Sequence, residues 1–146
     1  LFRMRRRESG SYIDIGLLIL RIGLGIMMML HGYPKLFGGP DLWVEIGTAT
    51  QSIGINFAPL FFGFMASITE FFGGLFLILG LFYRPTLLLL IIVMIVAASS
   101  HIAAGDGFTD TSHSIELAIV FISMLITGPG KNSLDAKLNK RSRRRY

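Results

Sequence analysis

The sequence predicts an all-α integral membrane protein, a four-helix bundle with both its N- and C-termini in the cytoplasm. Of its 146 residues, 52% are hydrophobic and only 16% are charged, and the mean hydropathy is +0.62. Its apolar residues gather in four long segments, a composition typical of membrane-spanning chains. Eleven of the fourteen Lys and Arg residues lie in two terminal stretches, 3–7 and 131–145, which is typical of cytoplasmic ends beside anionic lipid.

The four apolar segments define three regions of the chain. Each segment approaches the length of roughly 20 residues that a helix needs to cross a bilayer, and a helix pairs its own backbone groups in lipid. We expect no cleaved signal peptide, because the first segment is long and contains Arg21. The predicted regions are a basic arm (1–14), a transmembrane domain (15–130) with helices at about 15–37, 58–82, 86–104 and 112–127, and a basic tail (131–146), of which the last Arg-rich residues are expected to be disordered.

The connections between the segments predict the orientation. Arg84 lies in the turn between the second and third segments, whereas the loops at 38–56 and 105–111 contain acidic residues and no Lys or Arg. The positive-inside rule therefore places both termini and Arg84 in the cytoplasm. The long first loop contains Trp43, and we expect it to form a short amphipathic helix along the outer membrane surface.

Composition also excludes several classes of function. Because the chain has no cysteine, it can form no disulfide, thiolate metal site or cysteine-bound iron–sulfur cluster. Any redox chemistry would need a bound cofactor, a quinone or a partner subunit. The clustering of basic residues beside apolar segments argues for lipid, and not nucleic acid, as the polyanionic partner.

Two ionisable residues are predicted at the centre of the bundle. Arg21 lies near the middle of the first segment and Glu70 near the middle of the second, and an isolated charge at this depth is costly. Small residues next to Glu70, such as Ser67 and Gly74, indicate that this face meets another helix. We therefore predict an Arg21–Glu70 ion pair, which serves either as a structural clamp or in binding a substrate.

A second group of polar residues is predicted near the outer ends of three helices. Such a layer has several interpretations: side chains that reach the membrane boundary, a pocket for a quinone-like headgroup, a metal site, or haem ligated by two histidines. Of these, a metal site is not favoured, because the spacing of the residues is not that of a metal motif. The group consists of His31, Lys35, His101, His113 and Glu116.

Several of these residues fall in motifs that resemble the DoxX family. The first segment contains Leu20-Arg21, Gly25, His31-Gly32 and Lys35-Leu36, and the second contains Glu70-Phe71-Phe72-Gly73-Gly74 followed by Leu79-Gly80-Leu81 and Arg84. The exit Thr127-Gly128-Pro129-Gly130 with Ser133-Leu134-Asp135 is also similar to that family. The resemblance covers roughly residues 15–135. It places Arg21, His31, Lys35, Glu70 and Glu116 at motif positions.

The resemblance implies a multi-pass protein of a bacterial or archaeal inner membrane, in a family associated with oxidoreductase activity. We expect a quinone-linked oxidoreductase subunit that has no intrinsic cofactor and binds quinone. His113 and Glu116 are the candidate catalytic residues, because histidine titrates near neutrality and burial raises the pKa of a carboxyl group toward it. His31, Lys35 and His101 are the candidate ligand-binding residues.

Two other functions remain open at this stage. The chain could be a non-catalytic accessory subunit that packs against a larger respiratory or photosynthetic membrane complex, which the lack of cysteine and of a cofactor motif favours. It could also carry a small molecule or ion, although the chain has no internal repeat of the kind common in transporters. The expected partners are therefore the bilayer and other membrane-protein subunits.

Overall fold

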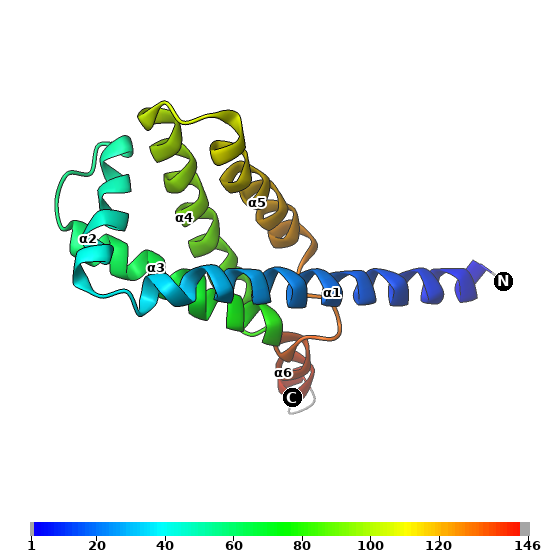
Figure 1. The fold of residues 1–146 in the computed structure, drawn as a ribbon. Coiled ribbons are helices and arrows are strands. Elements are labelled where there is room, and N and C mark those ends of the chain that lie inside the picture. Colours follow the sequence, from blue (N-terminus) through cyan, green and yellow to red (C-terminus); the bar gives the residue numbers. More distant parts are fainter. Residues whose placement is uncertain (1, 144–146) are drawn as a thin grey trace.

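The structure, a computed structural model, describes the backbone of residues 2–143 and the side chains of residues 10–142. All of its regular elements in that range are helices (Figure 1). In chain order they are α1 (Phe2–Leu36), α2 (Pro40–Gly47), the 3₁₀ helix η1 (Thr48–Ile53), α3 (Pro59–Leu79), α4 (Tyr83–Ala104), α5 (Phe108–Thr127) and α6 (Leu134–Arg143).

Four of the described helices are long and apolar enough to cross a membrane, as predicted. The spans are Gly10–Leu36 within α1 and the whole of α3, α4 and α5. Helix α1 begins before the first predicted helix, because residues 2–14 are helical and continue into the spanning segment without a break. It also places 134–143 in helix α6, where the sequence predicted a disordered Arg-rich end; 144–146 lie outside the described residues.

The helices pack in a chain of neighbours. Helix α1 lies along α3, α3 also contacts α2 and α4, and α4 pairs with α5 in a hairpin (Figure 1). The segment after α1 forms a short helix, α2, which confirms the helix expected around Trp43. This helix packs against α3 so closely that a Cβ on Gly63 would overlap the carbonyl group of Trp43.

Glycines let α1 and α3 cross at close range. A Cβ on Gly25 would lie 2.6 Å from the carbonyl oxygen of Gly74, and one on Gly32 would lie 2.5 Å from the backbone nitrogen of Phe71. Small residues at a crossing allow backbones in lipid to gain van der Waals contact, which replaces the hydrophobic driving force that lipid removes. This crossing determines which side chains of α1 reach α3.

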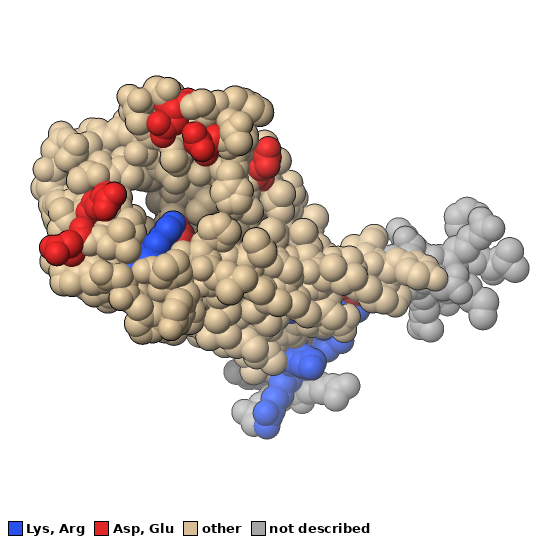
Figure 2. Space-filling view, in the orientation of Figure 1, with Lys and Arg blue, Asp and Glu red and all other residues tan. Residues whose placement is uncertain are grey.

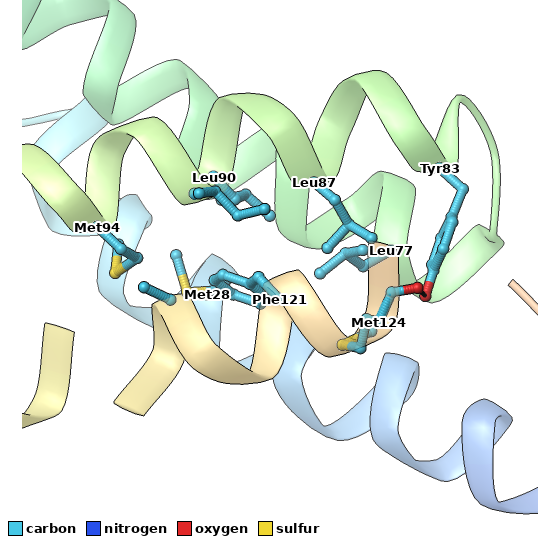
Figure 3. Packing of buried hydrophobic residues seen from close by; sticks show 10 residues of the cluster. Met28, Leu77, Tyr83, Leu87, Leu90, Met94, Phe121 and Met124 are labelled. Atoms are coloured by element: carbon cyan, nitrogen blue, oxygen red, sulfur yellow. Dashed lines mark hydrogen bonds between the residues drawn. The ribbon is translucent and has the colours of Figure 1, made fainter. Parts of the chain in front are cut away.

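The apolar core lies where α3, α4 and α5 meet α1. Leu77, Leu87, Leu90 and Phe121 are fully buried there, with Met28 of α1 against them (Figure 3). Tyr83 closes one end of this core, and its hydroxyl donates a hydrogen bond to the carbonyl oxygen of Met124 at 3.0 Å. The outward faces of the same helices expose Ile and Leu side chains, as lipid-facing surfaces do.

The two ends of the bundle carry opposite charge (Figure 2). At one end, which we call the basic end, the last turn of α3 and the first turn of α4 meet α6. The basic residues described there are Arg84, Lys131, Lys137, Lys140 and Arg141. At the other, the acidic end, lie α2, the α4–α5 loop and the first turn of α5, with Asp41, Glu45, Asp106 and Asp110. The segregation follows the alternation of connections seen in the sequence.

Candidate functional site

Arg21 is buried at the basic end, where it binds backbone and no carboxylate. It is 1% exposed. Its Nε donates to the carbonyl oxygen of Leu77 at 3.0 Å, and Nη2 donates to that of Ile78 at 3.1 Å. Nη1 donates to the carbonyl of Pro129 at 2.7 Å, and both terminal nitrogens reach that of Asn132 at 3.2 Å. The planar guanidinium thus ties the end of α3 to the α5–α6 segment.

Two aspartates complete this connection. The carboxylate of Asp14 accepts a hydrogen bond from the backbone N–H of Lys131 at 3.0 Å. Asp135 accepts from the N–H groups of Phe82 and Tyr83 at 3.1 and 2.9 Å, which caps the first turn of α4 from outside the helix. Gly80 makes room, because its φ is +64° and a Cβ there would lie 2.8 Å from Cζ of Arg21. We call Arg21, Asp14, Asp135 and their partners the arginine hub.

The predicted Arg21–Glu70 pair is not formed. Arg21 contacts α3 at Leu77 and Ile78, whereas Glu70 lies seven residues earlier, about 10 Å away along the helix. Counting residues placed both side chains near mid-membrane, but the crossing of α1 and α3 offsets the two helices. The carbonyl groups freed where α3 ends satisfy the guanidinium instead.

Glu70 pairs with Lys35 at the other end of the crossing. Nζ of Lys35 lies 2.9 and 2.8 Å from the two carboxylate oxygens of Glu70. The Glu70 side chain is 5% exposed and that of Lys35 is 36% exposed. The carboxylate is therefore buried, whereas the lysine remains partly accessible. The backbone of Lys35 is held as well, because Nε1 of Trp43 donates to its carbonyl oxygen at 2.9 Å.

The Lys35–Glu70 pair borders a pocket of about 310 Å³, a size typical of small-molecule sites. Apart from the pair, Thr50 and Thr69, its walls are apolar or glycine, and they come from α2, η1, α3 and α4. Figure 2 shows the molecule hollowed in the region between α2 and α4, with charged atoms at the hollow. The rim is made by exposed apolar side chains of the spanning helices, namely Phe61, Met65, Leu89 and Ile92.

This rim gives the pocket a direction of access. Phe61, Leu89 and Ile92 are each more than half exposed on helices that are long enough to span the bilayer. In a membrane such side chains face acyl chains. The pocket therefore opens sideways, toward lipid, and the charged pair forms part of its wall.

The remaining predicted site residues lie outside this pocket. His31 and His113 approach one another across α1 and α5, with ring centroids 5.6 Å apart. The Nδ1–H of His31 donates to the carbonyl oxygen of Met27 at 2.8 Å, which leaves Nε2 as an acceptor. His101 lies 2.6 Å from the carboxylate of Asp106, and Glu116 is exposed one turn along α5 from His113.

The predicted outer layer is therefore divided. Lys35 belongs to the pocket, His31 and His113 form a pair, and His101 binds its own loop. Among the residues whose side chains are described, no three His, Asp or Glu side chains gather as ligands for a metal ion. Haem ligation by two of the histidines was one of the interpretations left open by the sequence, and nothing in the structure tests it.

Sequence reasoning missed the partners that complete these contacts. The sequence pattern predicted no contact for Asp14, Asp106 or Asp135, and it did not indicate that Thr50 and Thr69 line a pocket. The glycines did give a signal for the pocket: Gly47 and Gly63 permit α2 to lie directly on α3. No pattern in the chain indicates which carbonyl groups a buried arginine will bind.

Four spanning helices, opposite charge at the two ends and a partly buried ion pair beside a lateral pocket define a multi-pass membrane protein. The sequence profile of the DoxX family matches residues 16–103, and the chain belongs to that family. It is similar to two Escherichia coli (strain K12) proteins. Inner membrane protein YqjF is 29% identical over 88% of this chain and 95% of its own length, and inner membrane protein YphA is 27% identical over 92% and 98%. No solved structure matches the chain significantly.

Proposed function

We propose that this DoxX protein is the quinone-binding subunit of a membrane oxidoreductase and that the lateral pocket receives the quinone headgroup. One observation carries the proposal: an apolar pocket that opens toward lipid has a Lys–Glu pair in its wall. A lipid-soluble molecule with a small polar head fits both features, because its ring can lie among apolar walls while its oxygen meets the ammonium group.

The ammonium group of Lys35 is suited to a carbonyl oxygen. It carries three N–H donors, of which two point to the carboxylate of Glu70. The third can donate to a ligand in the pocket. Glu70 holds the Lys35 side chain in place, and a charge-assisted hydrogen bond in apolar surroundings is stronger than a neutral one.

Proton delivery is the second part of the proposal. A quinone takes up two electrons and two protons to become a quinol, and here a partner subunit with a flavin or iron–sulfur centre supplies the electrons. Lys35 and His31 are four residues apart on one face of α1, and His31 meets His113, beside which lies Glu116. His113 and Glu116, with His31, are therefore the proposed proton donors.

Trp43 provides a probe for binding, since it is the single tryptophan and its indole donates to the carbonyl of Lys35. Quinones quench indole fluorescence. Titrating a short-chain ubiquinone analogue into the purified protein in nanodiscs should give saturable quenching. Ala66→Phe, which fills the pocket wall, should weaken the apparent affinity by about tenfold or more. Ile119→Phe, on the exposed face of α5 and outside the pocket, should leave it unchanged.

Linear quenching that is equal in all three proteins would mean that quinone only partitions into lipid, and it would remove the binding proposal. Proton transfer has a separate test in native membranes. His113→Ala and Glu116→Gln should lower quinol-linked electron transfer while leaving saturable quenching intact. If both variants retain full activity, the two residues have no such role and the accessory-subunit interpretation becomes the better one.

A further inference from the structure

Helix α6 is fixed at the level where the spanning helices end. It begins after residues 128–133, which Arg21 and Asp14 bind from α1. At its own start, the N–H of Asp135 donates to the carbonyl oxygen of Gly80 at 3.0 Å, and the Asp135 carboxylate caps α4. Gly80 ends α3 and Phe82 precedes α4, so these bonds place the root of α6 beside two membrane boundaries.

The exposed face of α6 combines apolar and basic side chains. Leu134 and Leu138 are four residues apart and so lie on one face; they are 37% and 53% exposed. Lys137 and Arg141 follow next to them on the helix, and Lys140 lies beyond; all three are exposed. Asp135 points instead to the protein. Figure 2 shows this basic surface at α6.

We propose that α6 binds anionic phospholipid headgroups, with Leu134 and Leu138 in the headgroup region and Lys137, Lys140 and Arg141 against the phosphates. Leucines exposed to water on a short polar helix gain nothing, whereas at a bilayer surface they are covered while the basic side chains meet phosphate oxygens. The location of α6 at the ends of α3 and α4 brings both groups to the right level. The occupant is lipid and not nucleic acid, because the leucines share the face with the charges.

Local lipid composition around α6 can be measured directly. In the variant Trp43→Phe/Leu138→Trp, the single indole reports which lipids are next to α6. The protein is placed in vesicles of fixed phosphatidylglycerol and phosphatidylcholine content, with bromine on the acyl chains of one lipid or of the other. Quenching by brominated phosphatidylglycerol should exceed quenching by brominated phosphatidylcholine, at equal bromine content, by about twofold or more.

Neutralising the three bases as K137Q/K140Q/R141Q should reduce that ratio to about one, and high salt should reduce it as well. The native Trp43, at the acidic end, serves as the matched control and should show no preference. If Leu138→Trp misfolds, Leu134→Trp replaces it. Absence of quenching by either lipid, or equal quenching by both at low salt, would overturn the proposal. Neither result depends on whether the pocket binds quinone.

Discussion

The arginine hub and the Lys35–Glu70 pair use the same two helices in opposite ways. At both, a long cationic side chain of α1 reaches α3. Arg21 is 1% exposed and donates five hydrogen bonds to four carbonyl groups, whereas the Lys35 side chain is 36% exposed and binds one carboxylate beside a pocket of about 310 Å³. The two residues are fourteen apart, about 21 Å along one helix.

The difference lies in what covers each cation. The α5–α6 segment folds over Arg21 and, together with the carbonyl groups of Leu77 and Ile78 in α3, it occupies all five N–H donors, so none is left for a ligand. At the other end α2, η1, α3 and α4 surround a pocket that the Lys35–Glu70 pair borders. A buried charge in a membrane helix is often taken as a sign of function. Here the more deeply buried one holds the fold, and the half-exposed one faces the candidate ligand site.

Removing Arg21 should have the largest effect on stability. Arg21→Ala removes the donor to four carbonyl groups, of which those of Leu77 and Ile78 end α3, and it breaks the side-chain link to Pro129 and Asn132, so we expect a loss of about 3 kcal/mol or more. Arg21→Lys should recover only part, because an ammonium lacks the planar fork. Unfolding in detergent measures both, with the exposed Arg84→Ala as a near-silent control. A loss under 1 kcal/mol for Arg21→Ala would contradict the hub.

Breaking the Lys35–Glu70 pair should lower the free energy of unfolding by less than the loss of Arg21 does. The size of the effect should depend on which partner is removed. Lys35→Met leaves Glu70 buried and unpaired, so we expect a loss of stability of about 2–3 kcal/mol. Glu70→Gln leaves Lys35 without its partner, but water or a lipid headgroup can reach this side chain. We therefore expect a loss of stability of only about 1 kcal/mol. The double variant should recover part of the loss. The cycle of Arg21→Ala with Glu70→Gln should instead be additive within about 0.5 kcal/mol; clear coupling there would restore the pair that the sequence predicted.

A substitution at Asp135 tests how much its hydrogen bonds to α4 contribute to the stability of the arginine hub. Asp135→Ala removes the cap on the first turn of α4, and we expect a loss of about 1 kcal/mol. Asp106→Ala at the acidic end, where the partner His101 is partly exposed, should change stability by only a few tenths of a kcal/mol. Equal effects of the two substitutions would mean that the capping bonds add nothing.

Single cysteine substitutions, which should perturb stability least, test the orientation of the protein in the membrane. Both termini and Arg84 should face the cytoplasm, and Trp43 and Asp106 the opposite side, because basic connections stay inside. Single cysteines at positions 43, 84 and 106 of this cysteine-free chain should leave stability nearly unchanged and report the side by membrane-impermeant labelling. Labelling of position 43 only from the cytoplasm would reverse the assignment and place the basic end outside.

Local pattern was sufficient for the elements of this fold. Apolar length predicted all four spanning helices, and glycine and proline punctuation located most of their ends to within a few residues. Helices α3 and α4 begin at or near Pro59 and Pro85, and α5 ends next to Gly128. Proline and glycine affect the backbone only within a few residues, so these ends can be predicted from the local sequence. Helix α6 was missed, because its stability depends on Gly80 and the first turn of α4, which lie far away in the sequence.

By itself the sequence determined that the chain spans a membrane four times, how its charge is divided between two ends, and which ionisable residues are buried. It could not determine which groups those residues bind. That depends on the offset between α1 and α3, which is produced by backbone contact at Gly25, Gly32 and Gly74 and appears in no local pattern. The tertiary structure therefore decided that Arg21 binds carbonyl groups and that Lys35 pairs with Glu70. It also decided that a pocket forms beside the Lys35–Glu70 pair.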